Sequence, residues 1–519
     1  MATWMSGYVA DVAYTLGFYR ELAPSFLHFA CLINGVDAPP LGRPMRYCEL
    51  GCGRGYGTAL LAAANPDVEF VGVDFNPSHI AEARSLASRA GLTNVTFMEM
   101  GFGDAARSSD PRLSNFDVVV LHGVYTWVAA SVRKEIDQFI RDKLLAGGVV
   151  YNSYNAMPGW ANAVPIQHLL MEVANRSSRD SMAAIKEGLE LLGTLSEKNS
   201  AFVGQSPGIK ARIERMRKQD PAYLVHEFLN AGWQALFVTE VIANFSEAKL
   251  TYVGSATLLE NRLDLCVPKD LQPIVAAAPD VAMREMLKDF VINKQFRRDI
   301  YVKGPQTMSA RDQRQGFDKL VFAATGQSKD LPEKFPMPIG EVTPKKETLA
   351  ALTATMAEKP ATGAELIAAG AKAGIREGDV ILLILLLVNG SIITPGRADH
   401  AGADRSASRR LNDLMFELAP AADSHRFVTS PVLGSAIPAA FVDRLIAPLV
   451  LKSPKADDAE IARQTFDRIA KAGQSFRRDG KALEKTDENV ASIVGLVKEF
   501  REQRLPRWRA LGVVDGKGK

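Results

Sequence analysis

A glycine-rich stretch follows a short apolar segment early in the chain. It reads Glu49-Leu50-Gly51-Cys52-Gly53-Arg54-Gly55-Tyr56-Gly57, and the alanine- and leucine-rich residues after it predict a helix. Asp74 ends a second apolar stretch, 68–74, which predicts a strand. Glycines let a backbone approach a ligand closely, and an acid after the second strand of a βαβ unit suits the hydroxyls of a ribose. The pattern therefore predicts a nucleoside-binding βαβ unit.

The spacing of the glycines excludes two common phosphate-binding loops. A dinucleotide fingerprint needs glycine at the first, third and sixth positions, but the sixth position is Tyr56 or Thr58 in the two available registers. A P-loop needs a Gly-Lys-Ser/Thr ending, and the segment has no lysine. Glu49 would also repel a pyrophosphate and favour an amine or a cation. These features favour S-adenosylmethionine, which carries an amine and a sulfonium and no phosphate.

Composition and charge indicate an ordinary globular protein of several domains. The chain has 519 residues, of which 47% are hydrophobic and 23% charged. Such a length suggests two to four domains. The net charge of +3 is too small to predict a nucleic-acid or membrane partner. The four cysteines form no CxxC pair, so we expect neither a disulfide framework nor a metal site.

The chain offers no sequence signal for export or membrane insertion. Residues 1–7 lack the basic and apolar regions of a signal peptide. The longest apolar run, 380–388, is about half the length that spans a bilayer, and it predicts a buried helix. A cytoplasmic location is therefore the expectation.

Strand-like and helix-like segments alternate after residue 45. Strands are predicted at 68–74, 95–99, 116–121 and 149–154, and helices at 77–90 and 132–145. This alternation is typical of an α/β protein with a parallel sheet covered on both faces. The sequence then predicts a helical insertion at about 161–232, two last strands at 250–255 and 263–267, and a helical region around 296–299.

We expect three parts along the chain. The first, 1–270, contains the sheet and its insertion, which leaves the sheet at the edge where ligands bind and is a candidate substrate lid. A connecting region at 220–345 overlaps the last strands and ends in a linker at about 325–345, which is rich in proline, glycine and lysine. Residues 346–519 predict a mostly helical C-terminal domain with a winged-helix-like unit.

The glycine loop and Asp74 resemble those of class I S-adenosylmethionine-dependent methyltransferases. Further segments resemble the family of these enzymes that carries a methyltransferase regulatory domain: 18–24, 122–127, 153–160, 223–229, 253–256 and 296–299. The resemblance covers about residues 10–300 and weakens beyond 346. It implies a Rossmann-like class I sheet and S-adenosylmethionine as cofactor. The family includes bacterial lysine methyltransferases that act on outer-membrane proteins.

The resemblance also assigns residues to the cofactor. It implies that Glu49 lies near the methionine amino group and that Asp74 binds the ribose. Many class I enzymes bind the adenine amino group with an acid after the third strand, but that position here is Gly101. Adenine is then held by packing and backbone groups, or by Asp104. The predicted cofactor-binding residues are Glu49, Gly51, Cys52, Gly53, Gly55, Asp74, Phe75, Phe102 and His122.

Aromatic residues gather at the ends of the fourth and fifth predicted strands, beside the expected methyl donor. They form either a channel for an amine substrate or a packing layer under the insertion. An apolar channel would help a lysine lose its proton, and aromatic faces attract a methylated ammonium. His122 is a candidate general base or a local structural histidine, and Asn155 holds a substrate group or a turn. The predicted catalytic residues are Tyr125, Trp127, Tyr154, Trp160, His122 and Asn155.

Three functions remain open at this stage. The favoured prediction is a methyltransferase that acts on the lysine side chain of a protein substrate. The second is a methyltransferase for a small-molecule amine or metabolite, and the third is a non-catalytic protein that senses S-adenosylmethionine. Arg297 and Arg298 either meet an acidic substrate or form a solvated or ion-paired face, and the second interpretation is favoured.

Overall fold

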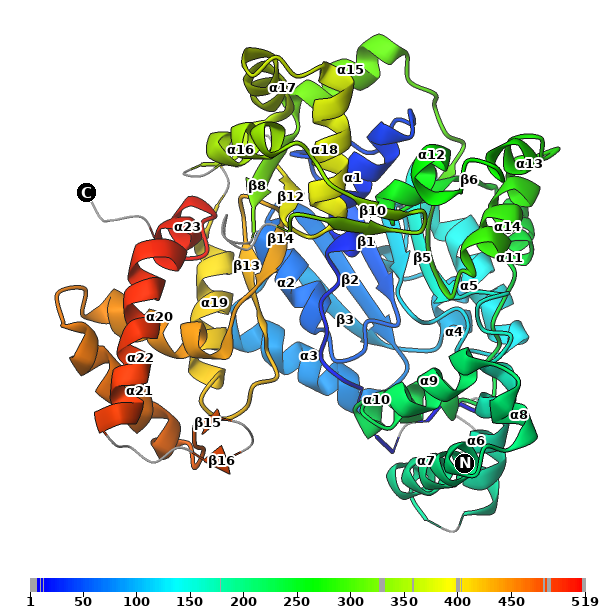
Figure 1. Cartoon of the computed structure of the whole chain (residues 1–519), viewed down its shortest axis with the longest axis horizontal. Helices are drawn as coiled ribbons and strands as arrows, with labels where there is room; N and C mark the ends of the chain where they lie inside the picture. The colour runs from blue at the N-terminus through cyan, green and yellow to red at the C-terminus, as the bar shows by residue number, and fades with distance from the viewer. Residues whose placement is uncertain are drawn as a thin grey trace.

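A seven-stranded sheet forms the centre of the molecule (Figure 1). The computed structural model describes residues 7–9, 11–12, 14–177, 179–325, 332–356, 359–397, 402, 404–478, 481–482 and 487–515. The strand order is β3-β2-β1-β4-β5-β7-β6, in which β7 is antiparallel to both of its neighbours and β1–β5 are parallel. The strands are β1 (Met45–Leu50), β2 (Val68–Asp74), β3 (Val95–Glu99), β4 (Phe116–Leu121), β5 (Leu144–Asn155), β6 (Leu250–Ser255) and β7 (Phe296–Lys303).

Helices cover both faces of this sheet because successive strand residues point to opposite sides. Tyr47 and Phe70 pack under α1 (Pro24–Ile33), α2 (Tyr56–Ala64) and α3 (Pro77–Arg89). Cys48 and Val71, one residue further along the same strands, pack under α4, α5 and α11. These three helices are α4 (Phe102–Arg107), α5 (Ala130–Lys143) and α11 (Val238–Glu247). The α/β fold predicted from the alternating pattern is therefore confirmed.

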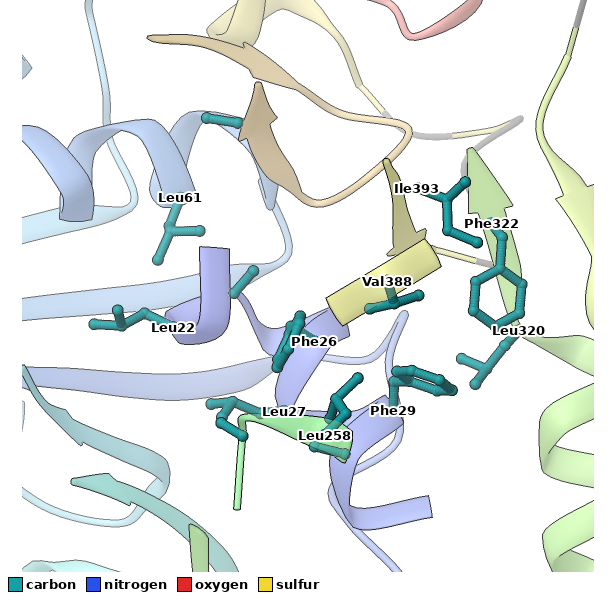
Figure 2. Packing of buried hydrophobic residues seen from close by; sticks show 14 of the residues in the cluster. Leu22, Phe26, Leu27, Phe29, Leu61, Leu258, Leu320, Phe322, Val388 and Ile393 are labelled. Atoms are coloured by element: carbon teal, nitrogen blue, oxygen red, sulfur yellow. The ribbon is translucent and has the colours of Figure 1, made fainter. Parts of the chain in front are cut away.

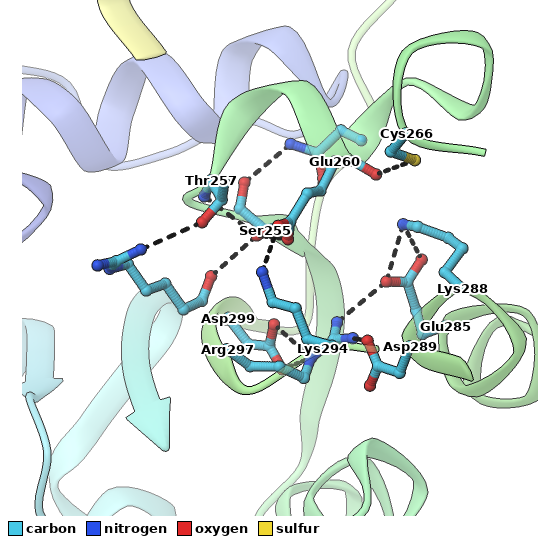
Figure 3. A network of polar contacts seen from close by, with 12 residues as sticks. Ser255, Thr257, Glu260, Cys266, Glu285, Lys288, Asp289, Lys294, Arg297 and Asp299 are labelled. Carbon is cyan, nitrogen blue, oxygen red and sulfur yellow. Dashed lines mark hydrogen bonds and ion pairs between the residues drawn. The ribbon is translucent and has the colours of Figure 1, made fainter. Parts of the chain in front are cut away.

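The last two strands of the sheet correct the sequence-based prediction. Residues 263–267, predicted as a strand, form the short helix α12 (Leu263–Cys266) and its end, where Cys266 and Val267 join a small apolar cluster. The seventh strand is instead β7, in the region predicted to be helical. Its charged residues hid the strand pattern, because Arg297 and Asp299 are buried in the network of ion pairs that Figure 3 shows.

The helical insertion after β5 has an apolar core of its own. It contains α6 (Val164–Arg176), α7 (Ser181–Glu197), α8 (Ala201–Gly204), α9 (Pro207–Met216) and α10 (Pro221–Phe228). Trp160 belongs to this core, and so does Val9 of the N-terminal segment. The Val9 amide donates to Asn230 Oδ1 over 3.0 Å, and the Ala231 amide donates to the Gly7 carbonyl over 2.9 Å. The N-terminal segment is therefore fastened to the insertion.

Helices connect β6 to β7. They are η4 (Leu258–Asn261), α12, α13 (Gln272–Ala276) and α14 (Val281–Ile292). A short 3-10 helix, η2 (Arg20–Leu22), precedes α1, and η3 (Pro111–Leu113) precedes β4.

The C-terminal region is mostly helical, as predicted. Its helices are α15 (Ala310–Lys319), α16 (Lys346–Thr355), α17 (Gly363–Lys372), α18 (Glu377–Asn389), α19 (Ser406–Leu418), α20 (Phe441–Lys452), α21 (Asp458–Lys471), α22 (Asp487–Glu499), the π-helix η6 (Phe500–Arg504) and α23 (Leu505–Ala510). One small sheet joins β8 (Val321–Ala324), β11 (Ala361–Thr362) and β12 (Ile393–Gly396). Three hairpins complete the region: β9 (Phe335–Met337) with β10 (Gly340–Val342), β13 (Phe427–Ser430) with β14 (Ser435–Pro438), and β15 (Arg477–Arg478) with β16 (Lys481–Ala482).

One apolar core joins the C-terminal region to the sheet domain. Figure 2 shows Phe26 and Phe29 of α1 close to Val388, Phe322 and Ile393 of the C-terminal region. The apolar run 380–388 is the buried part of α18, and among the described residues no helix is long and apolar enough to cross a membrane.

Hydrogen bonds also join the C-terminal region to the helix that follows the glycine loop. The Tyr56 hydroxyl of α2 donates to the Phe427 carbonyl over 3.1 Å, and the Thr429 hydroxyl donates to the Leu60 carbonyl over 3.0 Å. The C-terminal region therefore supports the helix that begins at the glycine loop.

Candidate active site

The glycine loop lies between β1 and α2, and its backbone conformation requires glycine. Gly51, Gly53 and Gly55 have φ values of +77°, +53° and +71°, which side-chain-bearing residues rarely adopt. A Cβ atom on Gly55 would lie 2.4 Å from the Ala83 side chain, whereas one on Gly53 would meet no atom within 4 Å. Gly55 therefore allows close packing against Ala83, whereas Gly53 presents bare backbone to open space.

Asp74 ends β2 directly opposite this loop. Its Oδ2 accepts a hydrogen bond from the Gly53 amide over 3.0 Å, and its Oδ1 accepts one from the Asn76 amide over 2.9 Å. The His79 Nδ1 atom lies 3.5 Å from Oδ1. These contacts fix the carboxylate, which is 7% exposed, at the wall of a cavity.

We call this cavity, of about 140 Å³, the strand-end cavity. It lies at the carboxyl ends of β1, β2, β3 and β4, where open α/β sheets bind their ligands. Asp104 is not among its lining residues: its side chain is 72% exposed and pairs with Arg107. The lining residues are Tyr8, Tyr14, Gly51, Gly53, Asp74, Phe75, His79, Met100, Gly101, Phe102, His122, Gly123, Val124, Trp127, Val128, Val132 and Glu135.

Glu49 faces a smaller space of about 70 Å³, the glycine-loop cavity, which shares Gly51 and Gly53 with the strand-end cavity. The Thr58 hydroxyl donates to Glu49 Oε2 over 2.5 Å. Burial and the nearby charge of Asp74 raise the pKa of Glu49 to about 7. Cys52, Tyr14 and His122 line the same space. A cationic ligand would lower the energetic cost of holding this carboxylate ionised.

A third cavity, of about 310 Å³, opens between the sheet and the helical insertion, and we call it the insertion cavity. It shares Tyr14, His122, Gly123 and Trp127 with the strand-end cavity, so the two spaces meet at these residues. The remaining lining residues are Tyr19, Asn155, Trp160, Arg212, Arg215, Met216, Gln219, Tyr223, Glu227, Phe228, Gln295, Phe296 and Arg298.

Glu227 is the buried acid of the insertion cavity. It lies on α10 and is 5% exposed. The Asn155 side chain donates to its Oε1 over 2.5 Å, and the Tyr223 hydroxyl donates to its Oε2 over 3.2 Å. Burial raises the pKa of Glu227 to about 7, while these hydrogen bonds act in the opposite direction. A carboxyl group with this pKa can gain or lose a proton near neutral pH.

His122, at the end of β4, lines all three cavities. Burial and the charge of Arg298 lower its pKa to about 3, so the ring is neutral at physiological pH. Its Nδ1 lies 3.0 Å from the Tyr151 hydroxyl and 3.1 Å from the Ser153 hydroxyl. The ring of Tyr19 stacks on it with centroids 3.5 Å apart. This geometry suits a fixed wall of the site better than a general base.

The structure brings some predicted site residues together and separates others from the cavities. Trp127, Trp160, Asn155 and His122 line the insertion cavity, while Gly51, Gly53, Asp74, Phe75 and Phe102 line the strand-end cavity. Tyr125, Tyr154 and Gly55 line none of the cavities described above. The Tyr125 hydroxyl donates to Asp137 over 3.0 Å, and the Tyr154 hydroxyl donates to Asp299 over 2.7 Å.

Sequence reasoning missed the acid of the insertion cavity and two tyrosines of the N-terminal segment. Glu227 lies in the segment 223–229, which the family resemblance had already singled out. Tyr8 contacts Phe75 with ring centroids 5.4 Å apart, and Tyr14 contacts Trp127 at 5.5 Å. Neither contact follows from a local pattern, because the partners lie far apart in the sequence.

Comparisons with known proteins match the chain to methyltransferase families. Residues 41–222 match a family described as a methyltransferase domain, and residues 220–303 match one described as a predicted methyltransferase regulatory domain. Protein sll1526 of Synechocystis is 33% identical over 98% of this chain and 100% of its own length. A trans-aconitate 2-methyltransferase of Methylobacterium radiotolerans is 33% identical, over 17% of this chain and 30% of its own.

The fold is similar to that of a solved bacterial structure along nearly the whole chain. PKMT2 of Rickettsia typhi superposes with a TM-score of 0.69 at 17% identity, covering 96% of this chain and 99% of that one. A second structure of PKMT2, in complex with AdoHcy, gives a TM-score of 0.68. The described residues contain no cluster of three or more side chains suited to a metal ion. The chain belongs to the family of class I S-adenosylmethionine-dependent methyltransferases that carry a methyltransferase regulatory domain.

Proposed function

We propose that this methyltransferase transfers the methyl group of S-adenosylmethionine to the side-chain amine of a lysine in a protein substrate. The observation that carries the proposal is Glu227, a buried carboxyl group in an aromatic-lined cavity that meets the strand-end cavity. A buried acid with a pKa raised to about 7 fits a ligand that arrives as a cation and must lose a proton.

The residues around the glycine loop fit the cofactor. Asp74 offers carboxylate oxygens to the ribose hydroxyls, and Phe75 and Phe102 offer apolar surface to the adenine. Glu49, in the adjoining glycine-loop cavity, offers a negative charge to the methionine amino group. The cofactor, when bound, supplies an electrophilic methyl group on a sulfonium. Transfer of this methyl group requires only an aligned nucleophile and the exclusion of water.

The acceptor lysine must be neutral before it can attack. With an ordinary pKa of about 10.4, deprotonation at pH 7 costs roughly 4–5 kcal/mol. Glu227 can hold the incoming ammonium and accept its proton, with Asn155 and Tyr223 fixing the carboxylate. The amine nitrogen then forms its bond to the methyl carbon as the carbon–sulfur bond breaks. His122, neutral at this pH, does not compete for the proton.

The aromatic walls of the insertion cavity serve the same reaction. Tyr14 and Trp127 line the place where the two cavities meet, and Trp160 lines the insertion side. Their faces attract a cationic or methylated ammonium and keep water from the reacting atoms. The insertion 161–232 thereby contributes one wall of the acceptor site. The likeness to PKMT2, a protein lysine methyltransferase, supports a protein as the substrate.

Methyl transfer to extract proteins tests the proposal. The purified enzyme is incubated with S-adenosylmethionine labelled with tritium on its methyl group, once with dialysed cell-extract proteins and once with the small-molecule filtrate. We expect tritium in protein bands and methyl-lysine after acid hydrolysis. Label confined to the filtrate would instead indicate a small-molecule methyltransferase. Absence of label from both fractions would contradict the proposed reaction.

A matched pair of variants tests whether the labelling of protein depends on the insertion cavity. Glu227→Gln removes the buried acid, whereas Glu187→Gln removes an exposed acid from α7 of the same insertion. Label in protein should be lost with the first substitution and kept with the second.

A further inference from the structure

A fourth cavity continues the insertion cavity toward the C-terminal region. It measures about 430 Å³, and we call it the interdomain cavity. It shares Tyr19 and Arg298 with the insertion cavity. Thr394 of β12 and Phe427 of β13 line its other side. A chain whose lysine enters the insertion cavity therefore finds continuous concave surface that reaches the C-terminal region.

Four arginines line these two joined cavities, and none forms an ion pair with any residue that the structure describes. Arg212, Arg215 and Arg298 line the insertion cavity, and Arg20 and Arg298 line the interdomain cavity. Arg212 lies over the Trp160 ring at 4.9 Å and donates to the Gln295 side chain over 3.0 Å. Arg20 donates to the Asn389 carbonyl over 3.2 Å. These partners are neutral, and Glu227 and Glu21 act on Arg212 and Arg20 only through space, without a direct ion pair.

Two of the four guanidinium groups also have buried donors without an acceptor. The Nη1 atom of Arg20 and the Nε atom of Arg298 are inaccessible to solvent and make no hydrogen bond within the described part of the chain. Buried donors are normally satisfied, so the described residues do not use the full hydrogen-bonding capacity of the Arg20 and Arg298 guanidinium groups. Arg298 is common to both cavities, so its side chain lies at their junction.

The two cavities contain fewer acids than arginines. Glu227 is held by Asn155 and Tyr223 in the insertion cavity, and Glu21 lines the interdomain cavity. The joined space thus offers one buried acid for an ammonium group and several cationic groups along its walls. This distribution is the complement of a lysine with carboxylates beside it in the sequence.

We propose that the joined cavities select lysines flanked by aspartate or glutamate. The target ammonium goes to Glu227, and the neighbouring carboxylates meet Arg298 and Arg215, with Arg20 reached by residues further along the substrate. The inference rests on the proposed lysine methylation and adds the sequence context of the acceptor.

Two short peptides with one central lysine test this preference. One carries aspartates on both sides of the lysine, and the other carries asparagines, which have nearly the same shape without the charge. We expect kcat/KM to be about tenfold higher for the aspartate peptide at low salt, the effect of two ordinary, partly exposed ion pairs. The ratio should fall toward one at roughly 0.5 M salt, because salt screens such charges.

Single-charge variants assign the preference to the cavity. Arg215→Gln and Arg298→Gln should each lower the aspartate-to-asparagine ratio about threefold, half of the effect on a logarithmic scale. Lys218→Gln is the matched control, because Lys218 is an exposed cation just past α9 and lines none of these cavities. It should leave the ratio unchanged.

The outcomes separate the two proposals. Equal kcat/KM for both peptides would overturn the acidic preference and leave lysine methylation standing. A preference that survives both arginine substitutions would overturn the assignment to these residues. No methyl-lysine in either peptide, together with label only in small molecules of the extract, would overturn both proposals.

Discussion

Two neighbouring arginines on β7 have opposite surroundings. Successive strand residues point to opposite faces of a sheet, so Arg297 and Arg298 diverge. Arg297 is 3% exposed and pairs with Glu285 at 3.0 Å, Asp289 at 2.6 Å and Asp299 at 2.9 Å. Figure 3 shows these three acids around it. Arg298 lines the insertion cavity and has no ion pair among the described residues.

The difference separates a structural ionic cluster from the wall of a cavity. Every oxygen-bearing partner of Arg297 belongs to the chain itself, and Lys288 adds a second buried cation that donates to Glu285 over 2.8 Å. In the insertion cavity Glu227 makes no direct ion pair with the arginines among the described residues, and it acts on Arg212 only through space. Charges that are already paired hold the fold, whereas unpaired charges at a cavity wall fit a ligand.

The largest effect should follow from removing the central cation of the paired cluster. Arg297→Met leaves Asp299, Asp289 and Glu285 without their shared partner, and a buried pair broken on one side costs about 3–5 kcal/mol. We expect the free energy of unfolding, measured by urea denaturation, to fall by that amount. Arg284→Met, which removes an exposed cation from the same helix as Glu285, should change it little. A stable Arg297→Met protein would show that the cluster is not essential to the fold.

The next effect concerns the unpaired acid. Glu227→Gln keeps the shape of the side chain but cannot accept a proton, so we expect kcat/KM to fall about 10²-fold, a usual contribution of an acid–base group. The measurement is initial-rate kinetics on a lysine peptide that the native enzyme methylates. A loss below threefold would contradict the assigned role. The Glu187→Gln protein is again the matched control.

The same substitution should change how stability depends on pH. Because the folded-state pKa of Glu227 is raised to about 7, the folded protein holds a proton that the unfolded chain releases near its ordinary pKa of about 4.5. The free energy of unfolding therefore falls as pH rises between these two values. Glu227→Gln removes this contribution, and the loss of stability between pH 5 and pH 8 should shrink by about 1–3 kcal/mol. An unchanged pH dependence would mean that the carboxyl group titrates normally.

Much of the fold and of the strand-end cavity followed from local patterns. The glycine loop, Asp74 and strands β1–β4 are short-range features with apolar runs and left-handed glycines, so their sequence carries the information. The strand β7 did not, because its Arg297 pairs with Glu285 and Asp289 of α14, partners that no local pattern reveals. The same limit applied to Glu227, whose partner Asn155 is distant in the sequence.

The aromatic residues show why the sequence alone did not predict which side chains reach the cavity. Trp127, in the loop after β4, and Tyr154, near the end of β5, look equivalent in sequence, but Trp127 lines the insertion cavity and Tyr154 packs in the apolar cluster under α4, α5 and α11. Which face a residue takes near a strand end depends on the loop that follows, and a single sequence does not determine that geometry. The N-terminal tyrosines were missed because only the folded insertion brings them over the site.

The smallest effect should come from Tyr154, which the sequence had assigned to the substrate channel. Its buried hydroxyl donates to Asp299 over 2.7 Å and so belongs to the paired cluster. Tyr154→Phe should lower the free energy of unfolding by about 1–2 kcal/mol, the effect of one hydrogen bond to a charged group, and leave kcat within twofold. Tyr301→Phe is the matched control, since the Tyr301 hydroxyl is buried without a hydrogen-bond partner in the described residues, and its stability should not fall. A tenfold loss of kcat in Tyr154→Phe, with unchanged stability, would indicate that Tyr154 acts in the acceptor site and not in the ion-pair cluster.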